Sequence, residues 1–94
     1  MTTRLAGVVV GNPVVDEVRR DGMFLRQVCG GTATYATLAL RALGLDTVLV
    51  GATGDDFPDM LRAPLTAAGV DISPVRLLPG SSTAYRLDYE GDPP

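Results

Sequence analysis

The fold is decided by the stretch GGTATYATLALRALG at residues 30–44. Two glycines open an apolar segment that predicts a helix over residues 32–43, and Gly44 stands where a left-handed C-terminal cap is needed. The next residues, LDTVLVGATGDD at 45–56, predict a short strand over 47–50 followed by a second glycine-rich, acidic loop. This order places two flexible loops at the same end of a parallel sheet, where open α/β folds bind ligands.

Five other runs in the chain predict strands. They cover residues 5–10, 14–20, 23–28, 75–78 and 83–89. The first is apolar and β-branched, as in a buried parallel strand, and together with the helix and the strand that follow it predicts a right-handed parallel crossover. Asp21-Gly22 separates the second and third runs, and an Asp-Gly pair between strands is a strong signal for a type I′ hairpin.

Two helices are expected, and both have an apolar face. On the first, only Thr34, Thr37 and Arg41 are expected to point outward. Its expected apolar face comprises Ala33, Tyr35, Ala36, Leu38, Ala39, Leu40 and Leu43.

The second helix is predicted to begin at Asp55 or Asp56 as N-cap, with Pro58 in its first turn, and to end at Gly69. Its expected apolar face comprises Met60, Leu61, Leu65 and Ala68. Pro64 removes one backbone hydrogen bond and predicts a kink or a split.

Composition excludes several classes of function. The chain has 94 residues, 46% hydrophobic and 20% charged, with a net charge of −3, which predicts one small globular domain. Its basic residues are all Arg and are scattered, so nucleic acid is not an expected partner. No apolar run reaches membrane-spanning length and no signal-peptide pattern is present, so no membrane partner is expected. The lone cysteine, Cys29, suggests a reducing compartment, and we expect the protein to be cytoplasmic.

Two features could bind a ligand. Gly30 and Gly31 precede the helix, where unpaired backbone N–H groups could meet ligand oxygens; the alternative is a tight turn without a ligand. The pair does not belong to a dinucleotide-binding or P-loop motif. Asp16 follows the first strand and enters the hairpin, so its carboxylate could accept hydrogen bonds from a ligand; the alternative is a turn-capping role.

The other polar residues leave alternatives open. Asp55, Asp56 and Asp59 could bind Mg²⁺ or, as we prefer, offset the positive end of a helix. Tyr35 either stacks on a ligand or packs in the core. Cys29 could be reactive, but a small apolar filler is the better interpretation. Because the chain has no His, no Ser-His pair can form within it.

The order and spacing of these motifs resemble the N-terminal signature of the ribokinase (PfkB) family of sugar kinases. The positions in register are Gly30, Gly31, Ala33, Thr37, Gly44 and Gly54, and similar segments are GNPVVD at 11–16, GDDF at 54–57, GVD at 69–71 and Thr83. Tyr35 stands where the family has Asn. The resemblance extends from Leu5 to about Tyr89.

The resemblance implies the start of a ribokinase-like, three-layer, Rossmann-type parallel sheet with a small β-hairpin lid, in truncated form. Residues 1–94 would be the N-terminal part of one kinase domain, with lid strands at about 14–28 and 83–89. Asp16 would orient the sugar, and Gly30, Gly31 and the helix start would hold its other oxygens. The weaker substrate-binding candidates are Asn12 and Tyr35.

The implied reaction is ATP-dependent phosphorylation of a sugar or nucleoside hydroxyl, with Mg²⁺, in the complete protein. The family's catalytic base lies in a Gly-Ala-Gly-Asp motif of its C-terminal part, which nothing here matches. We therefore expect no catalytic, cofactor-binding or metal-binding residue in this segment, and no activity from it alone.

Two alternatives to a kinase segment remain. One is a truncated or split fragment that binds ligand without catalysis or forms homodimers through its lid strands. The other is a small α/β domain of unrelated function.

Overall fold

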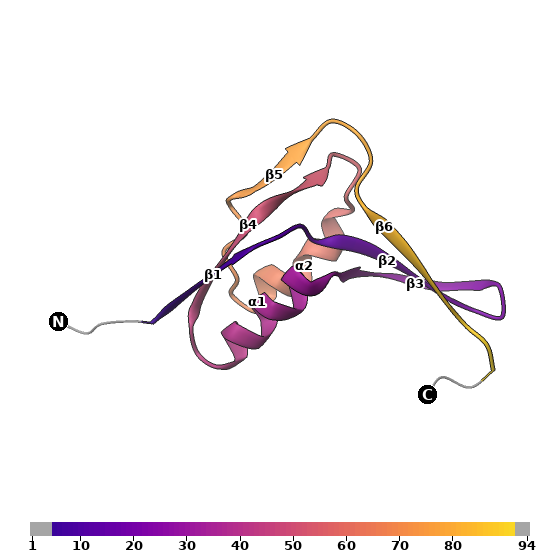
Figure 1. Ribbon diagram of the computed structural model, residues 1–94, viewed down its shortest axis with the longest axis horizontal. Coiled ribbons are helices and arrows are strands. Elements are labelled where there is room, and N and C mark those ends of the chain that lie inside the picture. The colour runs from indigo at the N-terminus through magenta and orange to yellow at the C-terminus, as the bar shows by residue number, and fades with distance from the viewer. Residues whose placement is uncertain (1–4, 92–94) are drawn as a thin grey trace.

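The computed structural model describes residues 5–91 (Figure 1). The elements in chain order are β1 (Ala6–Val10), β2 (Val14–Arg20), β3 (Met23–Gly30), α1 (Thr32–Ala42), β4 (Asp46–Gly54), α2 (Asp59–Ala67), β5 (Val75–Leu78) and β6 (Ala84–Tyr89). They form two three-stranded sheets with the orders β1-β4-β5 and β3-β2-β6. Among the described residues, no helix is long and apolar enough to cross a membrane.

The first sheet, which we call the central sheet, is entirely parallel. Strand β1 pairs with β4 so that Val8 lies beside Val48 and Val10 beside Val50. Strand β4 is longer than predicted, because its end, from Gly51 to Gly54, pairs with β5. The predicted α/β class with a parallel sheet is confirmed.

The second sheet, which we call the lid sheet, projects from one end of the molecule (Figure 1). Strands β2 and β3 are antiparallel, and the residues of their turn, Asp21 and Gly22, have φ values of 49° and 78°. Both angles are positive, as a type I′ turn requires, so the predicted hairpin is confirmed. Strand β6 joins on the other side of β2 and runs parallel to it.

The core lies between the central sheet and the two helices. Leu49 and Leu65 are 0% and 1% exposed and pack with Ala33 and Val70. A smaller cluster of Val15, Phe57 and Leu61 connects α2 to the lid sheet. The opposite face of the central sheet carries exposed valines. The described residues therefore supply the sheet and one helix layer of the fold.

The predicted faces of α1 are wrong at several positions. Thr34 and Thr37 are buried, whereas Tyr35 and Leu43 are exposed. Burial of the threonines is inexpensive because each hydroxyl donates a hydrogen bond of 2.7 Å to a carbonyl one turn earlier, Thr34 to Gly30 and Thr37 to Thr34.

The predicted start of α2 is also wrong. The helix begins at Asp59 after Pro58, and neither Asp55 nor Asp56 caps it. It continues through Pro64 without splitting. Met60, expected on the apolar face, is 78% exposed.

Candidate functional site

Asp16 and Gly30 lie together at the base of the lid sheet. Val14 pairs with Gly30, and Asp16 pairs with Val28, so the carboxylate of Asp16 lies beside the glycine. A methyl group added at Gly30 would overlap the Asp16 carboxylate. The φ of Gly30 is not positive. A glycine is therefore needed at this position for space and not for its backbone conformation. Two of the five residues that the sequence proposed for substrate binding, Asp16 and Gly30, thus lie in contact.

The Asp16 carboxylate is nearly buried and has no polar partner within the part of the chain that the structure describes. The residue is 8% exposed, and no hydrogen bond or ion pair reaches its side chain from the described part of the chain. Burial of a carboxylate is costly unless hydrogen bonds compensate it. Ligand hydroxyl groups would supply those bonds.

A hollow of about 540 Å³ opens in front of Asp16. Its volume falls within the range of about 300–1,000 Å³ that is usual for small-molecule sites. The wall comes from β2, β3 and β6 of the lid sheet, and Tyr35 enters it from α1. The lining residues are Asp16, Val18, Arg20, Leu25, Arg26, Val28, Tyr35, Leu87 and Tyr89.

Gly31 opens helix α1 with φ 91° and ψ 153°, a conformation that favours glycine. No side chain caps the helix, so its first N–H groups are available to an acceptor. They lie at a second hollow of about 370 Å³, which adjoins Gly11, Asn12 and Tyr85 as well as Gly31 and Thr32. Gly30 thus contacts Asp16, whereas Gly31 and the helix start line the second hollow and not the hollow of Asp16.

Asn12 fixes the loop after β1. Its side-chain oxygen accepts a hydrogen bond of 2.9 Å from the Ala52 N–H, and the Gly11 N–H donates to the Val50 carbonyl, also at 2.9 Å. Asn12 lines the second hollow but not the hollow of Asp16. The structure thus gives Asn12 a role in joining β1 to β4 and separates it from Asp16.

Tyr35 does not pack in the core. The side chain is 59% exposed and lines the hollow of Asp16, so the core alternative is wrong. Contact with a ligand stays a prediction. The chain's other two tyrosines, Tyr85 and Tyr89, line the second hollow and the hollow of Asp16, respectively.

Cys29 is half-buried behind Asp16. Burial raises the pKa of the Cys29 thiol, and the negative charge of Asp16 acts in the same direction. Its sulfur lies 3.4 Å from the Thr34 hydroxyl and packs against both core clusters. A raised pKa disfavours the reactive thiolate, as expected of a filler.

Asp56 and Asp59 make different contacts and do not form one site. Asp56 accepts a hydrogen bond of 2.8 Å from the Ser82 N–H, and hydrogen bonds from Ser82 lower the pKa of the Asp56 carboxyl. Asp59 lies in the first turn of α2, where a carboxylate offsets the helix dipole. No group of three or more metal-ligating side chains is present in residues 5–91.

Sequence reasoning missed the residues that the lid strands contribute to the hollow. Pairing of β2 with β6 places Leu87 and Tyr89 on the same face as Asp16, where both line its hollow. Their period-two alternation was visible, but nothing in it identified β2 as the partner strand. Arg26 of β3 was also missed, because an isolated arginine carries no motif.

Comparisons with known proteins agree with this architecture. An ATP-dependent ribose-1-phosphate kinase from Halopiger xanaduensis is 40% identical over 71 residues, which are 71% of this chain and 24% of that protein. The aminoimidazole riboside kinase of Salmonella enterica aligns with a TM-score of 0.73 and 26% identity, over 86% of this chain and 28% of its own. This chain is related to the ribokinase (PfkB) family and covers its N-terminal portion.

A further solved structure supports the fold. A PfkB-family carbohydrate kinase from Listeria grayi has a TM-score of 0.76 at 19% identity, over 88% of this chain and 28% of that one. No family model matches the chain. The chain spans about a quarter of the length of the curated relative that it matches.

Residues 5–91 offer no cluster of side chains that fits Mg²⁺, which one solved structure of this fold carries together with ATP. The structure of an E. coli ribokinase II homologue was determined with both groups bound. Here, the described residues hold no metal-ligating cluster, and neither Gly-Asp pair of the sequence follows Gly-Ala.

Proposed function

We propose that this chain is the N-terminal, sugar-binding segment of an ATP-dependent carbohydrate or nucleoside kinase of the PfkB type. In the complete protein, the γ-phosphoryl group of ATP would pass to a hydroxyl of the substrate. Residues 1–94 form part of one kinase domain, with the lid sheet as its substrate cover. The observation that carries the proposal is the nearly buried Asp16 carboxylate, which faces a hollow and has no hydrogen-bond or ion-pair partner among residues 5–91.

Each candidate residue has a defined part in binding. Asp16 accepts hydrogen bonds from two neighbouring hydroxyls, and Gly30 leaves the space in which its carboxylate lies. Past Gly31, the N–H groups at the start of α1 donate to other substrate oxygens. Tyr35 covers the sugar ring from the helix side. Because relatives act on ribose 1-phosphate or on aminoimidazole riboside, the proposed acceptor is a ribose derivative.

The segment alone is proposed to be inactive. Phosphoryl transfer depends on several groups that position the reactants and stabilise charge at the same time. This chain supplies only the acceptor side. Incubation with ATP and a panel of sugars should release no more ADP than a blank without sugar, and sugar-dependent ADP release would refute this part of the proposal.

The binding role is tested with Asp16→Asn, which removes the charge at nearly constant shape. We expect the variant to bind ribose at least tenfold more weakly than the original chain by isothermal titration calorimetry. Asp59→Asn is the matched control, since Asp59 lies in the first turn of α2. Equal ribose affinity of all three proteins would overturn the assignment of Asp16.

A second candidate function is homodimerisation through the lid sheet. Strands β3 and β6 are its edges, and Met23, Phe24 and Leu25 of β3 are 70%, 53% and 55% exposed. Unprotected apolar edge strands favour pairing with another chain. Size-exclusion chromatography over a range of concentrations tests this candidate, and a strictly monomeric profile would exclude it.

A further inference from the structure

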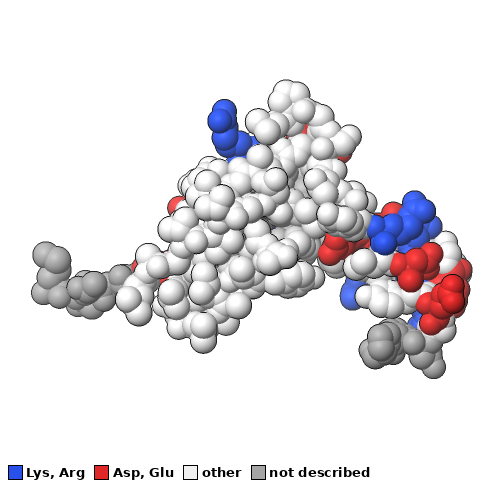
Figure 2. Space-filling model, viewed as in Figure 1, with Lys and Arg blue, Asp and Glu red and all other residues white. Residues whose placement is uncertain are grey.

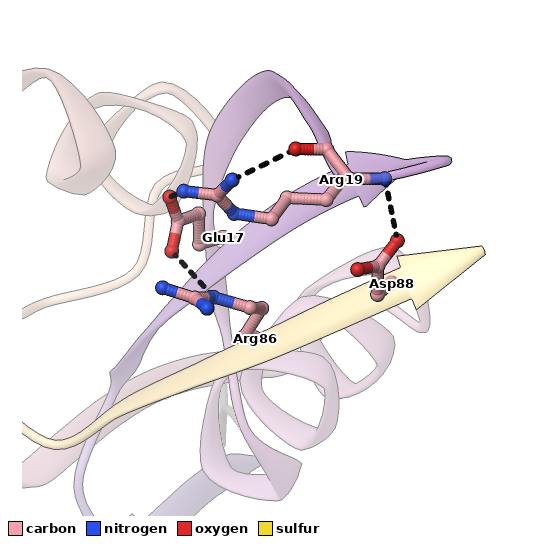
Figure 3. A network of polar contacts seen from close by, with 5 residues as sticks. Glu17, Arg19, Arg86 and Asp88 are labelled. Carbon is pink, nitrogen blue, oxygen red and sulfur yellow. Dashed lines mark hydrogen bonds and ion pairs between the residues drawn. The ribbon is translucent and has the colours of Figure 1, made fainter.

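The charged groups on the outer face of the lid sheet, opposite the hollow of Asp16, bond to one another. Glu17 accepts hydrogen bonds from Arg19 at 2.8 Å and from Arg86 at 3.4 Å (Figure 3). The space-filling view shows such charged groups gathered at the lid, while the rest of the face in view is mostly uncharged (Figure 2). Because these groups lie across the sheet from Asp16, they do not hold its carboxylate. The position of the carboxylate depends instead on the neutral backbone beside it, at Gly30.

A side chain of helix α1 fixes the position of Gly30. The Thr34 hydroxyl, in a side chain that is almost fully buried, donates a hydrogen bond of 2.7 Å to the Gly30 carbonyl. This bond joins the last residue of β3 to the first turns of α1, across the bend at Gly31. On its other side, Gly30 lies so close to the Asp16 carboxylate that even a methyl group would overlap it. Movement of Gly30 would therefore move the wall against which the carboxylate rests.

The Thr34 hydroxyl has a second polar neighbour, the Cys29 thiol. Its oxygen lies 3.4 Å from the Cys29 sulfur. A threonine hydroxyl carries one proton, and the bond to Gly30 uses it, so the thiol is the donor and the hydroxyl the acceptor. Burial raises the pKa of the Cys29 thiol, which keeps this donor protonated. The result is a directed chain of hydrogen bonds from Cys29 through Thr34 to Gly30, and it ends beside Asp16.

Thr37 makes the same kind of bond without this connection. Its hydroxyl is fully buried and donates a hydrogen bond of 2.7 Å to the Thr34 carbonyl. Both threonines therefore compensate their burial through a backbone carbonyl one turn earlier. The bond of Thr37 stays within α1, whereas the bond of Thr34 leaves the helix and reaches β3. Thr37 thus serves as an internal reference for a purely structural hydroxyl.

We propose that Thr34 is a positioning residue, whose hydroxyl holds Gly30 in place so that the Asp16 carboxylate stays directed into its hollow. The inference rests on the proposed sugar-binding function and adds a residue that lines neither the hollow of Asp16 nor the second hollow. A carboxylate that is already ordered binds its ligand more tightly, because the cost of ordering is met before the ligand arrives. Without the bond, Gly30 shifts and the carboxylate occupies several positions.

The first measurement is the ribose affinity of the original chain and of two variants, by isothermal titration calorimetry. Thr34→Val keeps the size and branching of the side chain and removes its donor, whereas Thr34→Ser keeps the donor. We expect Thr34→Val to bind ribose about tenfold more weakly, the order of effect of one buried hydrogen bond. Thr34→Ser should recover most of that affinity. Thr37→Val is the matched control: it should lower the urea midpoint about as much as Thr34→Val does, and leave ribose affinity unchanged.

The second measurement is made without ligand. Cys29 is the chain's only cysteine, so its S–H stretch gives a single band in the infrared spectrum. We expect Thr34→Val to move this band to the frequency of an unbonded thiol. Thr34→Ser and Thr37→Val should leave it in its original position, because both keep a hydroxyl at residue 34.

Several results would overturn the inference and leave the proposed function standing. They are equal ribose affinity of Thr34→Val and the original chain, failure of Thr34→Ser to recover the affinity, an equal loss in Thr37→Val, and an S–H band that does not move in Thr34→Val. If Thr34→Val does not fold, the original chain decides, since an S–H band at the frequency of an unbonded thiol would overturn the inference. If a chain that circular dichroism shows to be folded binds no ribose, the proposed function fails together with the inference.

Discussion

At the scale of single residues, the site depends on the contact between Asp16 and Gly30. The sequence identified both, one by its place after a strand and one by its place before a helix, and the β2–β3 register brings them together. The hydrophobic pattern of the sequence did not predict which side chains of α1 are buried. Thr34 and Thr37 are hidden because their hydroxyls bond to backbone carbonyls, and hydrophobic patterning does not take this compensation into account.

Gly30→Ala tests the contact directly. The new methyl group would overlap the Asp16 carboxylate, so we expect ribose affinity to fall at least tenfold and the free energy of unfolding to fall by about 1–3 kcal/mol. Gly7→Ala is the matched control, because its methyl would meet only the end of the Leu40 side chain. Calorimetry and urea denaturation give the two values. Unchanged ribose affinity in Gly30→Ala would show that the position of the carboxylate does not matter.

At the scale of elements, local pattern predicted strands and helices better than it predicted their partners. The Asp21-Gly22 turn specified the β2–β3 hairpin, because few residues accept two positive φ angles. The pairing of β6 with β2 joins residues about 70 positions apart in sequence, as in the Glu17–Arg86 contact, and no local signal encodes it. Asp56 was assigned to the wrong partner for the same reason, since it binds Ser82 instead of α2.

The outer-face contacts of the lid sheet should make stability depend on pH. The hydrogen bond from Arg19 lowers the pKa of Glu17 below its ordinary value of 4.5. A carboxyl with a lowered folded-state pKa contributes stability above its unfolded pKa and loses that contribution as pH falls through the folded value. We therefore expect the free energy of unfolding to decline below about pH 4.5, and to decline less in Glu17→Gln. Glu90→Gln serves as control and should keep the original slope in urea titrations at each pH.

Pro64 lies inside helix α2 and lowers the stability of the helix. Pro64 lies inside the helix and cannot donate to the carbonyl of Met60 one turn earlier, a loss of about 3 kcal/mol in a helix interior. Proline also restricts the unfolded chain, which offsets up to about 1 kcal/mol. Pro64→Ala should therefore stabilise the protein by about 2 kcal/mol, read from the urea midpoint. A lower midpoint than that of the original chain would show that Pro64 contributes packing that outweighs the missing bond.

At the scale of the whole molecule, both helices cover one face of the central sheet and the other face is open. Val8 and Val10 of β1 are 64% and 79% exposed, and Val50 beside Val10 is 37% exposed. The sequence could not reveal this, because a continuous apolar strand predicts burial on both faces without naming what covers each. An uncovered apolar sheet face is expected to bind hydrophobic dyes and to promote association.

Substitution of two valines on the open face tests whether that face is exposed in solution or packed like the core. Val10→Thr with Val50→Thr places hydroxyls on two neighbouring exposed positions and keeps the β-branched shape that suits strands. We expect dye fluorescence and light scattering to fall, while the free energy of unfolding changes by less than about 1 kcal/mol, as for most surface substitutions. Leu49→Ala on the helix-covered face is the contrast: Leu49 is fully buried, and the resulting cavity should cost about 2–5 kcal/mol. If the threonine pair destabilised the chain as much as Leu49→Ala does, the valine face would have to be packed in solution, and self-association through it would be the first explanation to test by sedimentation.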